Sequence, residues 1–249
     1  MPDRKKEKNM LLFYVRHGEP TYDPDQLTYL GHMQAIAIGQ RLAVHGIDKI
    51  YSSTSTRAYQ TAEPLAKMLR QDITQLDFCN EKHAFRDFSL VDEETDKRKW
   101  CFAIPKYARL MVSREVRNLG DAWYTHPGFP AENRFREGTE RVRRETDALM
   151  KEWGYERDEE RCGYRAVRKN DDRVALFAHG GFGYIFLSCL LDIPYSILST
   201  RLDIAHTTLT VIELKEDENG LVIPRALTMS NDGHLYKETL PVNERGERF

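Results

Sequence analysis

Five consecutive apolar residues, Leu11 to Val15, are followed at once by the polar sequence Arg16-His17-Gly18-Glu19. The apolar run is rich in β-formers and has no polar interruption, which is typical of a strand buried on both faces of a sheet. In open α/β sheets, ligands bind at the carboxyl ends of the strands, where this polar sequence would emerge. The feature therefore predicts a buried strand that delivers an arginine and a histidine to a binding edge.

The chemistry of this polar sequence suits phosphoryl transfer to a histidine. Arg16 offers a cation that keeps its proton, and Gly18 lets the backbone approach an anion closely. A neutral imidazole can attack phosphorus when its second ring nitrogen donates to a fixed acceptor, such as a nearby backbone carbonyl. A histidine after a strand is more often a hydrogen-bonded structural residue, so the motif alone leaves both interpretations open.

Four further segments follow the first motif along the chain. They are Asp25–Ala35, Tyr51–Ala62, Asn80–His83 and Ala178–Gly181. Taken with the first motif, and in this order, they resemble the histidine phosphatase superfamily, which includes phosphoglycerate mutases and histidine acid phosphatases. The resemblance covers residues 11–70, 76–90 and 173–214. It is closer to the branch of small phosphatases and cofactor-dependent phosphoglycerate mutases than to the acid phosphatases.

The resemblance implies catalytic and phosphate-binding roles for particular residues of these segments. It makes His17 the nucleophile and Glu81 the general acid, which later takes a proton from the attacking water. It implies that phosphate and substrate are bound by Arg16, Arg57, His179 and Gly180. Arginine suits this task because its planar fork donates two parallel hydrogen bonds to phosphate oxygens. We also expect the two arginines to disfavour the protonated form of His17, because like charges lower the pKa of a histidine.

A second carboxylate, Asp87, is the alternative to Glu81 as the general acid. It lies a few residues further along, in Phe85-Arg86-Asp87-Phe88, and either carboxylate could instead be an ordinary loop residue. No metal is expected, because arginines would supply the positive charge that metal ions bring to most phosphoryl-transfer sites. No other cofactor is expected either.

The order of the elements predicts an α/β fold. After the first strand, a helix capped by Thr28 and stopped at Gly46 precedes a short strand over 49–52. A helix from Ser55 to about Arg70 follows, and Pro64 should bend or restart it. This alternation predicts a three-layer sandwich, with a mostly parallel central sheet and helices on both faces. At 249 residues, we expect a single domain over residues 1–249.

Residues 92–135 interrupt this alternation. They join a charged cluster over 92–99 to a segment rich in aromatic residues. We expect a helical cap insertion over the active site, with a solvated helical pair as the alternative. The identity of the substrate would then depend on how the aromatic residues and cations of this segment fold over the pocket. The cations are Lys97, Arg98, Lys99, Lys106, Arg109 and Arg114.

The second half of the chain continues the α/β pattern. We expect an amphipathic helix from Glu137, an exposed loop or hairpin over 155–172, a buried strand over 173–178 and an apolar helix over 184–191. The runs 208–214 and 221–229 predict an antiparallel hairpin at the edge of the sheet. The polar tail from Ser230 is expected to be loosely held.

The composition indicates which partners the protein lacks. Its 37 lysines and arginines nearly balance 39 aspartates and glutamates, so neither nucleic acid nor a membrane surface is an expected partner. The apolar run after the basic segment 1–10 is too short for a signal peptide, and no stretch approaches the about 20 apolar residues of a membrane span. The four cysteines show no paired spacing, which favours a reduced, cytoplasmic protein. The sequence leaves the oligomeric state open.

Three functions remain compatible with these motifs. The preferred one is a phosphomonoester hydrolase that acts on a small phosphorylated metabolite through a phosphohistidine. The segment 20–26 is shorter than the corresponding stretch of the mutases, and no adjacent arginine pair for substrate binding is evident in 92–135. A cofactor-dependent phosphoglycerate mutase is therefore the first alternative. A catalytically silent phosphate-binding module is the second, although the complete set of site residues favours an enzyme.

Overall fold

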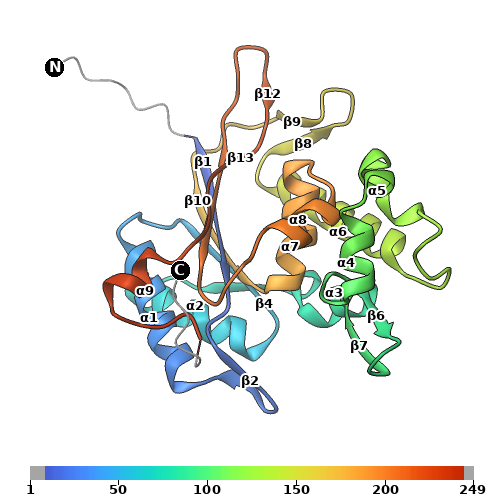
Figure 1. Cartoon of the computed structure of the whole chain (residues 1–249). Coiled ribbons are helices and arrows are strands. Elements are labelled where there is room, and N and C mark those ends of the chain that lie inside the picture. The colour runs from blue at the N-terminus through green and yellow to red at the C-terminus, as the bar shows by residue number, and fades with distance from the viewer. Residues whose placement is uncertain (1–8, 244–249) are drawn as a thin grey trace.

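The protein folds around a six-stranded sheet with the strand order β13-β11-β1-β10-β4-β5 (Figure 1). A computed structural model describes residues 9–243. Strands β1, β10, β4 and β5 are parallel, whereas β11 runs antiparallel to β1 and β13. Their bounds are β1 Met10–Arg16, β4 Lys49–Ser53, β5 Ile73–Leu76, β10 Arg173–Ala178, β11 Leu209–Leu214 and β13 Arg225–Asn231. The predicted α/β class with a mostly parallel central sheet is confirmed.

Helices cover both faces of the sheet, on opposite sides in Figure 1. One face carries α1 (Tyr29–Ala43) and α2 (Thr56–Leu69); the other carries α3 (Glu81–Phe88), α6 (Phe135–Glu152), α7 (Gly180–Leu191) and α8 (Tyr195–Arg201). Strand β1 supplies Leu12 and Tyr14 to one core and Phe13 and Val15 to the other, because successive side chains of a strand point to opposite faces. This double burial explains the uninterrupted apolar run.

The helices begin largely where the sequence predicts. Thr28 and Ser55 cap α1 and α2, since their hydroxyl oxygens accept backbone hydrogen bonds at 3.0 and 3.4 Å. Helix α2 runs through Pro64 without restarting. The apolar helix predicted over 184–191 starts earlier, at Gly180, and ten of its twelve residues are buried, so it forms part of the core.

The segment 92–135 differs from the predicted helical insertion. Strand β6 (Ser89–Asp92) pairs antiparallel with β7 (Lys97–Trp100), and the Asp92 carboxylate accepts a hydrogen bond from Lys99 at 2.6 Å across this hairpin. Strands this short carry too little periodicity to be predicted. Short helical segments follow: η2 (Cys101–Ala103), α4 (Pro105–Met111), α5 (Arg114–Asn118) and η3 (Gly120–Thr125). Helices α4 and α5 pack against α8.

The C-terminal region is more ordered than the sequence predicts. The segment 155–172, expected to be a loop or an exposed hairpin, contains the hairpin of β8 (Tyr155–Asp158) and β9 (Gly163–Ala166), which buries Tyr155 and Tyr164 in the core. Strand β12 (Leu221–Val222) pairs with β9, so only β13 completes the hairpin with β11. The expectation of a loosely held tail from Ser230 is wrong for the described residues 230–243, because α9 (Gly233–Lys237) buries Leu235 and Val242 is buried beyond it. These side chains pack against α1. Residues 244–249 lie outside the described part of the chain.

Two further properties concern the described part of the chain. No helix within residues 9–243 has the length and apolar character needed to cross a membrane. All four cysteines are free thiols; Cys162 is exposed and the other three are buried.

Candidate active site

Four neighbouring strands end at one edge of the sheet, and polar residues follow each of them. Arg16 of β1 lies in register with Ala178 of β10. His17 and His179 therefore follow at the same level, with ring centroids 5.1 Å apart. The end of β4 and the segments after β4 and β5 reach the same edge, where they contribute Ser53, Ser55, Arg57 and Glu81. The topology thus brings together residues that are far apart in the sequence.

His17 holds one ring nitrogen against the backbone and leaves the other for the pocket. Its Nδ1 lies 2.7 Å from the carbonyl oxygen of Gly18 and donates to it. Its Nε2 accepts a hydrogen bond from Nε of Arg57 at 3.2 Å, so this nitrogen carries a lone pair. Burial lowers the pKa of His17 well below its usual value, and the charges of His179, Arg16 and Arg57 lower it further. The ring is neutral, and burial is a larger cause than the cations named from the sequence.

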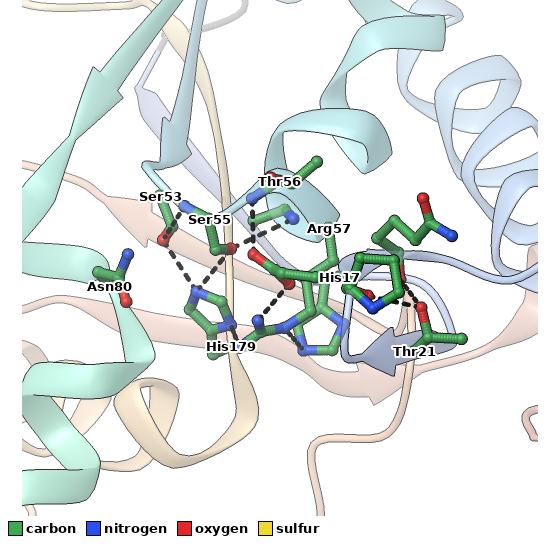
Figure 2. Close-up of polar contacts among 12 residues, drawn as sticks. His17, Thr21, Ser53, Ser55, Thr56, Arg57, Asn80 and His179 are labelled. Carbon is green, nitrogen blue, oxygen red and sulfur yellow. Dashed lines mark hydrogen bonds and ion pairs between the residues drawn. The ribbon is translucent and has the colours of Figure 1, made fainter.

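Arg57 connects the two histidines (Figure 2). Besides its bond to His17, its Nη2 lies 3.1 Å from Nδ1 of His179. Its Nη1 pairs with the Asp25 carboxylate at 2.6 Å, and the Tyr22 ring lies under the guanidinium, 5.4 Å from its centre. Every nitrogen of this guanidinium therefore has a fixed direction.

His179 is held on the side away from Arg57 by two serine hydroxyls (Figure 2). Its Nε2 lies 2.8 Å from Oγ of Ser53 and 3.3 Å from Oγ of Ser55. Because Nδ1 faces the Arg57 donor, we assign the ring hydrogen to Nε2. Burial lowers the pKa of His179 well below its usual value, and Arg57 and Arg16 add to this effect. His179 is therefore neutral while the pocket holds no anion.

Arg16 has an unused donor. Its Nη1 donates to the carbonyl oxygen of Ile204 at 2.6 Å and its Nη2 contacts Nε2 of His206 at 3.0 Å. Its Nε is buried and has no hydrogen-bond partner among the described residues. A buried guanidinium N–H without an acceptor is costly, and Arg16 lines the cavity. An anion is the natural acceptor for this group.

The loop that carries His17 is packed tightly against α1. A Cβ on Gly18 would lie 2.6 Å from the carbonyl oxygen of Gly31, and one on Gly31 would lie 2.1 Å from that of Glu19. Side-chain oxygens of Thr61 and Gln34 accept the backbone N–H groups of Gly18 and Glu19 at 3.0 and 2.9 Å. These contacts fix the backbone of the loop, including the carbonyl that orients His17.

Glu81 is the first residue of α3, and its carboxylate lies against the N-terminus of α7. Its two carboxylate oxygens accept the backbone N–H groups of Gly181 and Phe182, each at 3.0 Å. A Cβ on Gly181 would lie 2.3 Å from the Trp100 ring and 2.8 Å from Glu81 Oε1, so this position requires glycine. Burial raises the pKa of Glu81, and the two backbone hydrogen bonds and nearby arginines counter only part of this effect.

Asp87 lies at the other end of α3, away from these groups. Its carboxylate binds Arg86 at 2.7 Å, Arg141 at 3.1 Å and Arg134 at 3.4 Å. Burial alone would raise the pKa of Asp87, but Arg86 and Arg141 hold it below its usual value. Asp87 does not line the cavity that His17 and Glu81 share, so the structure places it in an arginine cluster instead.

A cavity of about 560 Å³ opens above His17. The polar end is lined by Arg16, His17, Arg57, Glu81, Gly180 and Gly181. We call the rest of the lining the outer part; it comprises Tyr22, Asn80, Lys82, Phe85, Trp100, Phe102, Tyr184 and Asp203. Within the described part of the chain, Trp100 and Phe102 are the residues of the segment 92–135 that line this cavity. The six cations expected over the pocket do not line it; Lys99 and Lys106, for example, pair with Asp92 and Glu93.

Several residues near the site were missed by the sequence analysis. Asp25, which orients Arg57, lies in β3 (Asp25–Leu27), the partner of β2 (Pro20–Tyr22). His206 lies 5.5 Å from the His17 ring, centre to centre, just before β11. An antiparallel strand begins at the edge where its parallel neighbours end, so a histidine before β11 was a usable signal.

The described residues contain no group of three or more His, Cys, Asp or Glu side chains placed to hold a metal ion. Positive charge at the site comes from arginines instead. Arg16 and Arg57 both line the cavity beside His17.

Comparisons with known proteins place this geometry among related folds. Residues 12–100 match the family model of the histidine phosphatase superfamily (branch 1). A search of curated proteins found no match.

Solved structures resemble the whole fold at low identity. A mycobacterial protein described as hydrolase 1 has a TM-score of 0.57 and 21% identity, over 88% of this chain and 98% of that one. A mycobacterial glucosyl-3-phosphoglycerate phosphatase has a TM-score of 0.56 and 18% identity, over 89% of this chain and 98% of that one. Phosphoserine phosphatase from Entamoeba histolytica, in complex with 3-phosphoglyceric acid, has a TM-score of 0.55 and 17% identity, over 91% of this chain and 99% of that one. These identities support a shared fold.

Proposed function

We propose that this protein, which belongs to branch 1 of the histidine phosphatase superfamily, hydrolyses the phosphomonoester of a small metabolite through a phosphohistidine at His17. The observation that carries the proposal is the state of His17. Its Nδ1 is held by the Gly18 carbonyl, and its Nε2 lone pair faces a cavity lined by Arg16 and Arg57. A neutral imidazole in this setting is a competent nucleophile.

In the first step, the Arg57 N–H group that donates to His17 Nε2 turns to a phosphate oxygen. The freed lone pair of Nε2 attacks phosphorus as the bond from phosphorus to the alcohol oxygen breaks. Arg57 and the unused Nε of Arg16 supply hydrogen bonds to the equatorial oxygens, where the transition state carries its charge. An anion beside His179 would raise the pKa of that ring, which could then donate to phosphate. The alcohol leaves with a proton from Glu81, whose pKa is raised by burial.

In the second step, water attacks the phosphohistidine and the bond from phosphorus to nitrogen breaks. Glu81, now ionised, takes the proton from water and returns to its starting state. Neutral His17 and inorganic phosphate are the products. No step requires a metal ion, because the two arginines provide the positive charge.

The size of the cavity and the names of the structural neighbours support the proposed substrate class. A volume of about 560 Å³ suits a small ligand rather than a folded protein surface. Two structural neighbours are named as phosphatases of glucosyl-3-phosphoglycerate and phosphoserine, which supports a small phosphorylated metabolite.

A labelling experiment tests the mechanism. Purified protein is mixed with a radiolabelled phosphomonoester, quenched in denaturant at high pH, and mapped. We expect label on His17 in a linkage that is lost in acid and kept in base. Label on Ser53 or Ser55 would identify another nucleophile and contradict the proposal.

A product assay separates hydrolysis from phosphoryl exchange. With an added chelator and without 2,3-bisphosphoglycerate, we expect inorganic phosphate to accumulate with one equivalent of alcohol. Conversion of 3-phosphoglycerate to 2-phosphoglycerate without phosphate release, in a parallel reaction that contains 2,3-bisphosphoglycerate, would favour a mutase. Phosphate binding without turnover of any phosphomonoester would favour a silent module.

A further inference from the structure

Four aromatic side chains form a continuous surface in the outer part of the cavity. We call Phe85, Trp100, Phe102 and Tyr184 the aromatic wall; all four line the cavity. The Phe85 ring meets Trp100 edge to face at 5.2 Å, Trp100 stacks on Phe102 at 5.6 Å, and Phe102 meets Tyr184 edge to face at 5.1 Å. Each ring is thus held by its neighbour, and the wall is preorganised.

The aromatic wall begins next to the proposed general acid. The Trp100 ring occupies the space where a Cβ on Gly181 would lie, 2.3 Å away. The backbone N–H of Gly181 binds Glu81. The alcohol oxygen must lie near Glu81 to receive its proton, and the aromatic wall is the apolar surface next to that position.

The wall has apolar surface left to bury. Phe85, Trp100 and Phe102 are only partly buried, unlike Tyr184. Rings that face a cavity gain free energy when an apolar or aromatic ligand covers them. A planar ring on the substrate would pack in the offset or edge-to-face geometry that the wall itself uses.

The charges beyond the polar end do not suit a second anion. Among the described residues that line the outer part, Lys82 is the cation and Asp203 the carboxylate. Lys82 lies 3.6 Å from the Asp77 carboxylate, and both side chains are more than half exposed. A carboxylate on the alcohol would meet one solvated, already paired cation and the negative charge of Asp203.

From these observations we infer that the preferred substrate is a phosphomonoester whose alcohol carries an aromatic ring and no second anionic group. This inference rests on the proposed function, since it names which phosphomonoester the same site hydrolyses. Trp100 and Phe102 are the specificity-determining residues that it adds.

A binding experiment tests the inference without turnover. The probes are 3-phenylpropylphosphonate and propylphosphonate, which share the phosphonate group and differ by the ring, and calorimetry gives the two dissociation constants. We expect the phenyl compound to bind about 10- to 100-fold more tightly, the gain from burying one ring. In Phe102→Leu and Trp100→Leu, we expect this ratio to fall toward one.

Tyr124→Leu is the matched control. Tyr124 is a half-buried aromatic residue of η3 that packs on Trp123, and it does not line the cavity. We expect the wild-type ratio in this variant. A ratio near one in the wild-type protein, or an equal loss of ratio in Tyr124→Leu, would overturn the inference.

Turnover then distinguishes the inference from the proposed function. The substrates are 2-phenylethyl phosphate, ethyl phosphate and 3-phosphoglycerate, all of which have an alkyl oxygen as leaving group. We expect kcat/KM to be about 10-fold or more higher for the phenyl compound than for either of the others. A preference for 3-phosphoglycerate would overturn the inference alone. If the phenyl phosphonate binds tightly but no phosphate is released, the proposed function fails and the aromatic preference stands.

Discussion

The polar end of the cavity and the aromatic wall are built in different ways. Arg16, His17 and His179 lie at the ends of adjacent strands and Arg57 lies at the start of α2, and hydrogen bonds to backbone or side-chain atoms fix each one. The aromatic wall comes from α3, β7, η2 and α7 and is held by ring packing. The polar end acts on a group that all phosphomonoesters share, whereas the wall contacts the part that differs. Changes at the polar end should lower turnover of every substrate, and changes at the wall should alter selectivity.

The largest effect is expected for His17→Ala. Without the nucleophile, turnover should fall by at least about 10⁴-fold for alkyl and aryl phosphates alike. The measurement is phosphate release, with near-ultraviolet circular dichroism as a check on folding. His32→Ala is the control, because His32 is an exposed histidine on α1. Near-normal hydrolysis of an aryl phosphate by His17→Ala would contradict the proposed mechanism.

A smaller and selective effect is expected for Glu81→Gln. A general acid matters most when the leaving oxygen is a poor leaving group, so kcat/KM for ethyl phosphate should fall by about 10²- to 10⁴-fold. For 4-nitrophenyl phosphate the loss should be much smaller, because that leaving oxygen is stable without a proton. Equal losses for the two substrates would show that Glu81 is not the proton donor.

Asp87→Asn should affect stability rather than proton transfer. The variant leaves Arg86, Arg134 and Arg141 without their shared carboxylate, of which Asp87 is the buried partner. Because the arginines are partly exposed, we expect a loss of about 2 kcal/mol in the free energy of unfolding, less than for a fully buried pair. Urea denaturation measures this loss. The ratio of ethyl to 4-nitrophenyl phosphate turnover should stay at the wild-type value; a change like that of Glu81→Gln would make Asp87 the acid.

The same contrast explains what the sequence could predict. The apolar run 11–15 and the capping residues Thr28 and Ser55 are local signals, and the structure confirms the strand and helices that they predict. His17 and His179 each follow such a strand, so topology alone brings them together.

The aromatic wall and the arginine cluster have no comparable local signal. Trp100 and Phe102 reach the cavity through a hairpin of two four-residue strands, and tertiary contacts decide its position. Glu81 and Asp87 lie on one helix, and burial raises the pKa of both carboxyl groups. At Glu81 the backbone N–H groups of α7 counter only part of this effect, whereas at Asp87 the arginines outweigh it, so the two pKa values shift in opposite directions. Partners distant in the chain, such as Arg141, settle that difference. The periodicity of the sequence does not reveal such partners.

The smallest expected effect is the pH dependence of the contribution that Glu81 makes to turnover. Glu81 must carry its proton to act as acid, and burial raises its pKa. Above that pKa the protonated fraction falls about tenfold per pH unit. His17 must be neutral, and its lowered pKa places its own limb well below neutral pH. The substrate phosphate also titrates, but equally for wild type and variant.

The ratio of kcat/KM for ethyl phosphate between wild type and Glu81→Gln therefore isolates Glu81. We expect this ratio to be flat at low pH and to fall as pH rises through the raised pKa of Glu81. A constant ratio from about pH 5 to about pH 9 would mean that no proton moves through Glu81.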